Sequence, residues 1–524
     1  MVERRGSFCR HPERTFSRVT TTPSPATDIR LAAAAADGSG EAARLVPPEF
    51  AKQHSLLPVA VRGGVLVVAA AGPVSTDVLE DLRLLTGLEV ALETSTSEAV
   101  SEGITDRYQV TVERMIEDLG ADAAAAAEGK NLHDIEVMAN EPTVVNLVNV
   151  IISTALRERA SDIHLLPFEK ANQLRYRVDG LLQEKPPPPR QLHAAIVSRI
   201  KIMAEMNIAE RFLPQDGHIQ IHHRGARVDI RVGTLPTIYG ESVVMRLLEK
   251  DSRLQRPEDL GLDPERAAIL RRLSEKPHGL FLTTGPTGSG KTTTLYSILQ
   301  ATYRVEKKVI TIEDPVEYEL PGVAQIPVKP GRGFTFATGL RAILRQDPNV
   351  VMVGEIRDAE TAEIAIRAAL TGHQVFSTLH TNDAAGAVTR LIDMGIEPFL
   401  VASSLEGVLA QRLVRRLCPS CRKPALASEG VRENFRIPPG EYWAAVGCEE
   451  CRGTGYRGRI GIFELLEITP ALHELILQRR SSAELKAAVR DTMITLFEDG
   501  IRKAADGVTT LEEVVRVCAG DVQE

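Results

Sequence analysis

The sequence contains no long apolar run. Its longest candidate, Val59–Ala71, is interrupted by an arginine and two glycines, whereas a membrane-spanning helix needs about 20 consecutive apolar residues. The first residues are rich in arginine but have no apolar segment behind them, so we do not expect a signal peptide. We therefore expect a protein without its own transmembrane segment, which would reach a membrane only through a partner.

Aromatic residues and excess positive charge are also scarce. Aromatics make up 4% of the chain, with one tryptophan, and the net charge is -8. Proteins that bind single-stranded nucleic acid combine stacking aromatics with a basic groove, so a nucleic-acid partner is not expected. Six cysteines in 524 residues are too few for a disulfide scaffold and favour a reducing compartment. A chain of this length has room for three or four domains of about 150 residues.

The clearest motif is Gly285–Thr292, which reads G-x-x-x-x-G-K-T. A short apolar strand, Leu280–Leu282, precedes it, and a helix-forming run follows it, the setting of a phosphate-binding loop. Its glycines let backbone N–H groups approach phosphate oxygens, and the helix N-terminus adds partial positive charge. Lys291 is expected to reach the β- and γ-phosphates of ATP, and Thr292 to ligate Mg²⁺. The nucleotide-binding residues are Gly285, Pro286, Thr287, Gly288, Ser289, Gly290, Lys291, Thr292 and Thr293.

Three further apolar strands end in polar residues, at Glu313, Glu355 and His380. Because such strands alternate with helices, the pattern predicts an α/β fold with a parallel sheet covered on both faces. Ligands bind outside the carboxyl ends of the strands in such sheets, so these residues should converge with the phosphate loop.

Phosphoryl transfer needs a residue that orients water and positive charge near the γ-phosphate. Glu355 is the expected water-orienting residue and Glu313 the second candidate. His380 either senses the γ-phosphate or is a structural histidine. A basic cluster around the acidic strand either pairs with its carboxylates or reaches a neighbouring subunit's nucleotide: Arg341, Arg345 and Arg357.

Four cysteines form two C-x₂-C pairs, Cys418 with Cys421 and Cys448 with Cys451. Four thiolates in two close pairs suit tetrahedral Zn²⁺ in a structural site, since no ligand position is left for water. Redox pairs or free thiols are the alternatives.

The chain divides into segments by composition. Residues 1–44 are expected to be disordered or to precede the true start; residues 45–110 form a small docking module; residues 111–140 form a linker. An α+β domain is expected at 141–255, and the ATPase core at 256–524, with the tetracysteine subdomain at 415–460. Arg231 and Arg246 lie in alternating strands of the α+β domain, so each can project from a sheet face whose other side is buried; the alternative is two solvated arginines on an exposed face.

These motifs resemble the secretion ATPases of the type II system (GspE-type), within the superfamily that includes type IV pilus motors. The resemblance covers about residues 45–520 and is carried by the phosphate loop, the acidic box Ile310–Tyr318, the Walker B segment Val350–Arg357 and the histidine box Thr371–His380. The motifs Ser161–His164 and Arg175–Gly180 and the four cysteines add to it.

The resemblance implies a RecA-like P-loop core, a preceding PAS-like α+β domain, an N-terminal α/β docking module and a zinc-binding tetracysteine insertion. It implies a hexameric cytoplasmic ATPase that powers type II secretion by driving pseudopilus assembly, bound to inner-membrane platform proteins through the N-terminal module. It also implies that Arg231 and Arg246 clamp nucleotide phosphates. The chain departs from the family pattern at three positions: Leu166, Phe212 and His218.

Three other functions remain open from the sequence. A type IV pilus assembly motor would use the same chemistry and differ in the membrane protein bound by residues 45–110. A nucleic-acid translocase would show ATPase stimulation by single-stranded DNA. A scaffold that binds ATP without hydrolysing it would keep its function after Glu355→Gln.

Overall fold

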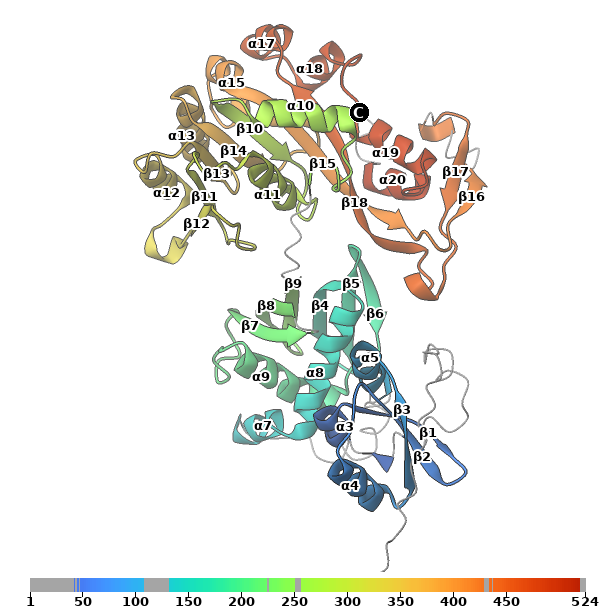
Figure 1. Ribbon diagram of the computed structural model, residues 1–524. Coiled ribbons are helices and arrows are strands. Elements are labelled where there is room, and N and C mark those ends of the chain that lie inside the picture. Colours follow the sequence, from blue (N-terminus) through green and yellow to red (C-terminus); the bar gives the residue numbers. More distant parts are fainter. Residues whose placement is uncertain are drawn as a thin grey trace, which may run out of the picture. The chain divides into compact units, whose positions relative to one another are not determined.

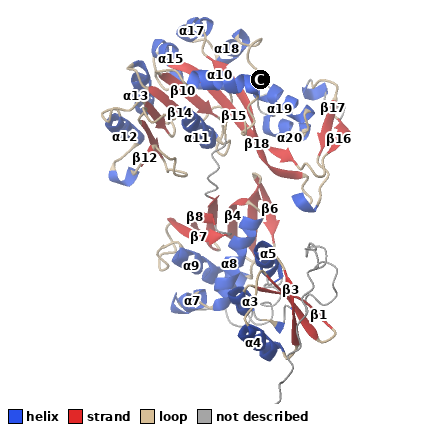
Figure 2. Cartoon of the chain, in the orientation of Figure 1, coloured by secondary structure: helices blue, strands red, loops and turns tan. Residues whose placement is uncertain are grey.

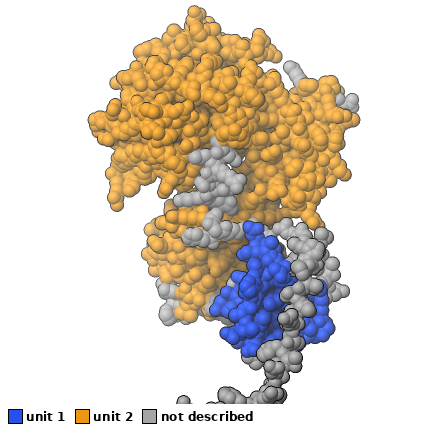
Figure 3. Space-filling view, viewed as in Figure 1, with its two compact units in different colours: residues 1–121 blue, residues 122–524 orange. Residues whose placement is uncertain are grey.

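The computed structural model describes residues 48–107, 132–223, 226–249, 256–427 and 437–518, together with residues 42, 45, 46 and 433–435. The expected disorder of residues 1–44 and most of the expected linker lie outside these ranges. The chain forms two compact units, residues 1–121 and 122–524 (Figure 3).

The N-terminal unit is a three-stranded sheet with helices on both faces. Strands β1 and β2 form a hairpin whose turn is Gly63–Gly64, both with positive φ, as expected from the sequence. Strand β3 runs parallel to β2. Ser75 caps α4 and Gly87 ends it in the left-handed conformation. The elements are α3 (Pro48–His54), β1 (Leu56–Arg62), β2 (Val65–Ala70), α4 (Thr76–Thr86), β3 (Glu89–Thr94) and α5 (Ser97–Arg107).

The second unit begins with a six-stranded antiparallel sheet of order β6-β5-β4-β9-β8-β7. Helices α8 and α9 pack on one face of this sheet (Figure 2). Tyr176 is fully buried there and donates its hydroxyl to the carbonyl of Ile151 at 2.8 Å. The elements are α7 (Leu132–Ala139), α8 (Pro142–Arg157), β4 (Ala160–Pro167), β5 (Asn172–Val178), β6 (Leu181–Lys185), α9 (His193–Met203), β7 (Gln215–His223), β8 (Ala226–Thr237) and β9 (Gly240–Glu249).

The sheet's other face carries a row of ionisable side chains across five strands. In register, His218 of β7 lies opposite Arg231 of β8, Arg231 opposite Arg246 of β9, Arg246 opposite Asp162 of β4, and Asp162 opposite Arg177 of β5. Residues directly opposite one another point to the same side of a sheet. We call these five residues the charged row.

The rest of the second unit is built on a seven-stranded sheet of order β12-β11-β13-β14-β10-β15-β18 (Figure 1). Neighbouring strands run parallel up to β15, and β18 is antiparallel to β15. The strands are β10 (Gly279–Thr284), β11 (Val309–Glu313), β12 (Ala324–Pro327), β13 (Val350–Val353), β14 (Gln374–Leu379), β15 (Leu405–Leu417) and β18 (Tyr456–Glu467).

Helices cover both faces of this sheet. Strand side chains alternate between two hydrophobic clusters, one that includes α10 and α11 and one that includes α12, α13, α14 and α15. The helices are α10 (Pro264–Ser274), α11 (Lys291–Thr302), α12 (Phe336–Ile343), α13 (Ala359–Leu370), α14 (Ala384–Asp393) and α15 (Pro398–Ser404), followed after β18 by α17 (Pro470–Leu477), α18 (Ser482–Ala488), α19 (Leu496–Ala505) and α20 (Leu511–Cys518).

Strands β15 and β18 extend as a ribbon to the cysteine subdomain. That subdomain holds the two-stranded sheet of β16 (Lys423–Leu426) and β17 (Glu441–Ala444). Trp443 of β17 lies 4.7 Å from the guanidinium of Arg422, and the Arg422 side chain donates to the carbonyl of Gly507. The subdomain is therefore anchored to the segment that joins α19 and α20.

The sequence predicted four strands of this sheet, and the structure confirms them as β10, β11, β13 and β14. Residues 132–139, at the end of the expected linker, form helix α7. The expected parallel sheet is correct for six strands, but β18 makes it mixed. No helix among the described residues combines the length and apolar character needed to cross a membrane.

Candidate nucleotide site

Residues Gly285–Gly290 connect β10 to α11 and form the phosphate loop. Gly285, Gly288 and Gly290 all have positive φ, which side chains rarely adopt. A Cβ on Gly285 would lie 2.4 Å from the carbonyl oxygen of Gln411, so only glycine fits there. The Gln411 amide also donates to the carbonyl of Ser289 at 2.6 Å. Gln411 of strand β15 therefore packs against the loop and holds it by a hydrogen bond. The sequence did not predict this contact.

Lys291 starts α11 and folds back over the loop. Its ammonium donates to the carbonyls of Gly285 at 2.8 Å and Pro286 at 3.1 Å. Burial lowers the pKa of Lys291 to about 8, although the nearby charge of Glu355 acts in the opposite direction. A phosphate group beside Lys291 would restore its charge. Thr292 follows it in the first turn of the helix.

Hydrogen bonds join the ends of three neighbouring strands. The Thr284 hydroxyl at the end of β10 lies 2.7 Å from the Thr381 hydroxyl and accepts the Thr381 N–H at 2.9 Å. The Thr378 hydroxyl on β14 donates to the carbonyl of Gly354, which follows β13, at 2.8 Å. Hydrogen bonds therefore join the segments of the phosphate loop, the Walker B segment and the histidine box at one edge of the sheet.

Glu355 lies at this edge with two partners. Its carboxylate pairs with Arg357, and its second oxygen lies 3.3 Å from Nε2 of His380. The Glu355 side chain is 14% exposed, whereas those of His380 and Arg357 are 45% and 65% exposed. The structure thus brings Lys291, Glu355 and His380 together, as the sequence predicted.

Glu313 occupies a different environment. Its side chain is 2% exposed and accepts hydrogen bonds from Tyr296, Thr311 and Gln325. It points toward α11, which carries Tyr296, and its oxygens are engaged by these donors. The arrangement is that of a buried structural carboxylate rather than of a group that faces water.

The expected phosphate-clamping arginines both lie in the charged row. Arg231 donates to the carbonyl of Val316 at 3.1 Å and pairs with Glu317 at 3.2 Å, both in the acidic box. Nε of Arg246 lies 3.1 Å from the carboxylate of Asp162. Arg231 thus contacts the ATPase core, whereas Arg246 pairs within its own sheet.

The other basic residues around the acidic strand have nearby partners. Arg341 pairs with Glu360 at 2.6 Å, and Arg345 donates to the carbonyl of Arg341 at 2.8 Å. Arg357 pairs with Glu355. Arg357 therefore pairs with one carboxylate of the acidic strand, Glu355, whereas Arg341 pairs with Glu360 on α13 instead.

The four cysteines of the two pairs form a compact cluster. The sulfurs of Cys418 and Cys448 are 3.8 Å apart, those of Cys421 and Cys451 are 3.8 Å apart, and all four lie within 4.8 Å of one another. A tetrahedron with bonds of about 2.3 Å has sulfurs about 3.8 Å apart. Backbone N–H groups of Cys448 and Gly455 point at the Cys451 sulfur, both at 3.1 Å, as in sites that hold thiolates. This cluster could hold a metal ion.

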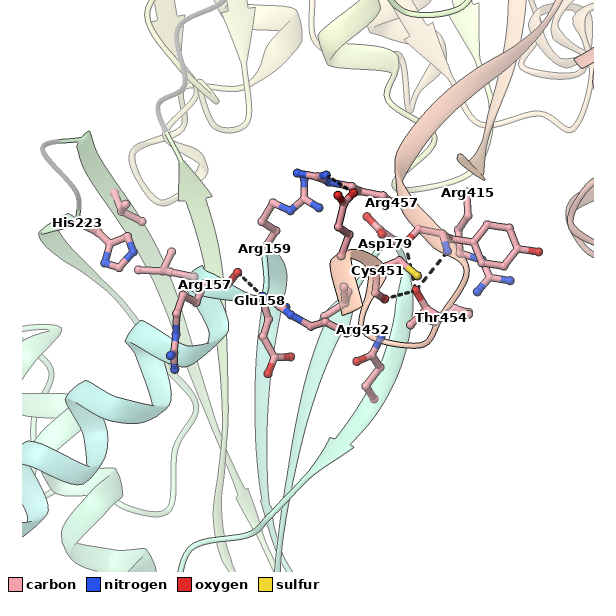
Figure 4. Close-up of a pocket in the computed structure, with 17 residues that line it drawn as sticks. Arg157, Glu158, Arg159, Asp179, His223, Arg415, Cys451, Arg452, Thr454 and Arg457 are labelled. Carbon is pink, nitrogen blue, oxygen red and sulfur yellow. Dashed lines mark hydrogen bonds and ion pairs between the residues drawn. The ribbon is translucent and has the colours of Figure 1, made fainter. Parts of the chain in front are cut away.

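A cavity of about 470 Å³ lies between the cysteine subdomain and the edge of the six-stranded sheet (Figure 4). Arg452 donates across it to the carbonyl of Arg157 at 2.8 Å, and the Gly458 N–H donates to Asp179 at 3.0 Å. None of its lining residues belongs to the phosphate loop. It is therefore distinct from the nucleotide site.

Comparison with known proteins agrees with this geometry. Residues 138–516 match the family model "Type II/IV secretion system protein", and residues 29–113 match the MshEN domain. The chain is 45% identical to the type IV pilus assembly ATPase PilB of Myxococcus xanthus, over 91% of this chain and 87% of that protein. It is 46% identical to the type II secretion system ATPase E of Vibrio cholerae, over 85% of this chain and 90% of that protein.

A solved structure shares the fold. The ATPase DotB of Legionella pneumophila superposes with a TM-score of 0.53 at 21% identity, covering 71% of this chain and 95% of that one. The core is thus an α/β fold of the RecA-like type. With a family model that spans most of the chain and relatives near 45% identity, the chain belongs to the type II/IV secretion system protein family.

Proposed function

We propose that this chain hydrolyses ATP to power type II protein secretion by driving pseudopilus assembly. It would act as a cytoplasmic hexamer, held at the inner membrane by platform proteins that bind its N-terminal module. The family, the two ATPase relatives and the MshEN match support this function. The preceding α+β domain would correspond to the PAS-like domain of such ATPases.

The main observation in support of this proposal is that Glu355 lies near both Lys291 of the phosphate loop and His380, at the same edge of the sheet. In hydrolysis the oxygen of a water molecule bonds to the γ-phosphorus while the bond to the β,γ-bridging oxygen breaks. Glu355 would orient that water. His380, 3.3 Å from Glu355, would hold this carboxylate and contact the γ-phosphate.

The remaining groups would bind and neutralise charge. Lys291 would contact the β- and γ-phosphates, with loop N–H groups around them. Thr292 would hold Mg²⁺, which neutralises phosphate charge when bound. Arg231 and Arg246 would add positive charge from the α+β domain. Glu313 would support the site through its bond with Tyr296.

We also propose that Cys418, Cys421, Cys448 and Cys451 hold one structural Zn²⁺. Four sulfurs at the spacing of a zinc tetrahedron, with backbone N–H groups directed at one of them, support this assignment. Zinc would fix the end of the β15–β18 ribbon.

A type IV pilus assembly motor is the second candidate, because the PilB relative is as similar as the type II relatives. Both machines need the same hydrolysis. They differ in the membrane protein that binds residues 45–110, so co-purification with this module distinguishes them.

The experiment that tests the site is Glu355→Gln, measured as phosphate release and ATP binding by the purified protein. Loss of the water-orienting carboxylate should lower kcat by about 10² to 10⁴, while ATP affinity is kept. Glu360→Gln is the matched control, because Glu360 is an exposed carboxylate that pairs with Arg341. Lys291→Ala should abolish hydrolysis. Turnover near the unmodified rate in Glu355→Gln would contradict the assignment.

A further inference from the structure

The charged row places one carboxylate between two guanidinium groups. Asp162 is 6% exposed and lies between Arg246 on one neighbouring strand and Arg177 on the other. One oxygen of Asp162 is 3.1 Å from Nε of Arg246, and the other accepts the Ser161 hydroxyl at 2.8 Å and lies 3.4 Å from Nε of Arg177. Asp162 is therefore fixed on both sides.

The contact with Arg246 uses only the inner nitrogen of the guanidinium. In the described part of the chain, the two terminal nitrogens of Arg246 make no hydrogen bond, and its side chain is 59% exposed. Arginine recognises phosphate best with two parallel N–H bonds. Held through Nε, Arg246 keeps its terminal nitrogens available for such a pair.

The row also has more positive than negative charge. Asp162 pairs with both Arg246 and Arg177, so within the charged row one carboxylate faces two guanidinium groups. The neighbouring Arg231 reaches Glu317 in the acidic box, which shows that this face of the sheet meets the segment that follows β11. An anion such as a nucleotide phosphate would supply the missing negative charge on this face.

We propose that Asp162 is a positioning residue for ATP binding: it holds the Arg246 guanidinium by Nε and orders its terminal nitrogens for phosphate. This inference rests on the proposed ATPase function. Ordering the side chain in advance removes part of the entropy cost of binding. Replacing Asp162 would also remove a negative charge that repels phosphate. Because Arg177 already offsets this charge, we expect the lost orientation of Arg246 to have the larger effect on ATP binding.

The test is Asp162→Asn, which keeps the shape and the Ser161 contact but removes the charge. We expect KM for ATP to rise about 10-fold with kcat within about 3-fold, since a contact made equally in the ground and transition states changes KM alone. Arg246→Ala should raise KM by a similar or larger factor. Adding Asp162→Asn to Arg246→Ala should change KM no further, because the two act as one unit.

Asp229→Asn is the matched control, because Asp229 also pairs with the Nε of an arginine, Arg227, on the same sheet face. It should leave KM unchanged. If Asp162→Asn does not fold, Asp162→Glu gives the second test: it keeps the charge but moves the carboxylate by one methylene, so Nε of Arg246 is no longer held in place and KM should rise, whereas an unchanged KM would contradict the positioning role.

The outcomes separate this inference from the proposed function. Hydrolysis that survives Lys291→Ala would overturn the nucleotide site itself. If Lys291→Ala abolishes hydrolysis but Asp162→Asn leaves KM unchanged, or if the effects of Asp162→Asn and Arg246→Ala multiply, the site stands and the positioning role is wrong.

Discussion

Tyr296→Phe tests whether Glu313 is a structural or a catalytic carboxylate. The Tyr296 hydroxyl is buried on α11 and donates to Glu313, and burial followed by this bond raises the pKa of Tyr296. Phenylalanine keeps the ring and removes the donor. Glu313 would retain Thr311 and Gln325, the latter at 3.2 Å, but would lose one of its three donors in a site that water does not reach.

The magnitude follows from burial. Leaving a buried acceptor without one donor costs about 1–3 kcal/mol. For a domain of about 250 residues, 1 kcal/mol lowers Tm by about 2–4 °C, so we expect a decrease of about 2–12 °C. Differential scanning calorimetry of the full chain measures this change, and steady-state phosphate release measures activity. We expect kcat to fall by less than about 5-fold, because the water-orienting group, Glu355, is not touched.

Tyr303→Phe is the control, because no hydrogen bond involves the Tyr303 hydroxyl in the described part of the chain. It should leave both Tm and kcat unchanged. A loss of kcat above about 100-fold in Tyr296→Phe, with an unchanged Tm, would refute the structural role of Glu313 and return it to the catalytic candidates.

Two further predictions concern the phosphate loop and the cysteine cluster. Because burial lowers the pKa of Lys291 to about 8, it is mostly neutral in the free protein at pH 8.5 and charged beside phosphate, so ATP binding should take up a proton there. Calorimetry in buffers of different ionisation enthalpy measures this proton uptake. ATP binding without proton uptake would contradict the lowered pKa of Lys291. Cys421→Ser removes one of four thiolates, so zinc should fall from about one ion per chain to near zero, with a change in the emission of Trp443 in the same subdomain. Elemental analysis of the purified variant decides the point, since an undiminished zinc content would exclude the site.

The sequence predicted the convergence at the nucleotide site because apolar strands ending in polar residues imply a parallel sheet with one functional edge. It could not separate the roles of Glu313 and Glu355. Glu313 is the last residue of β11 and points with Val309 and Thr311 toward the α11 side, whereas Glu355 lies beyond the end of β13. A motif gives the position of a carboxylate along the chain, but packing decides toward which face of the sheet the carboxylate points.

Strand β15 and the bond between Asp162 and Arg246 could not be predicted, because both depend on pairing between strands that are far apart in the sequence. Three arginines interrupt the apolar pattern of Leu405–Leu417, and the partner strand β18 follows only after the whole cysteine subdomain. Asp162 resembles an ordinary exposed residue of an alternating strand. Only the pairing of β4 with β9 brings it beside Arg246, and such long-range register is not encoded in local periodicity.

The support of the phosphate loop by Gln411 has a mechanical consequence. Beyond Gln411, β15 continues to Leu417, next to Cys418, and stays paired with β18 for most of that distance. A paired ribbon is stiffer than a single loop, so a displacement of the phosphate loop at Gln411 would be passed along β15 toward the cysteine cluster.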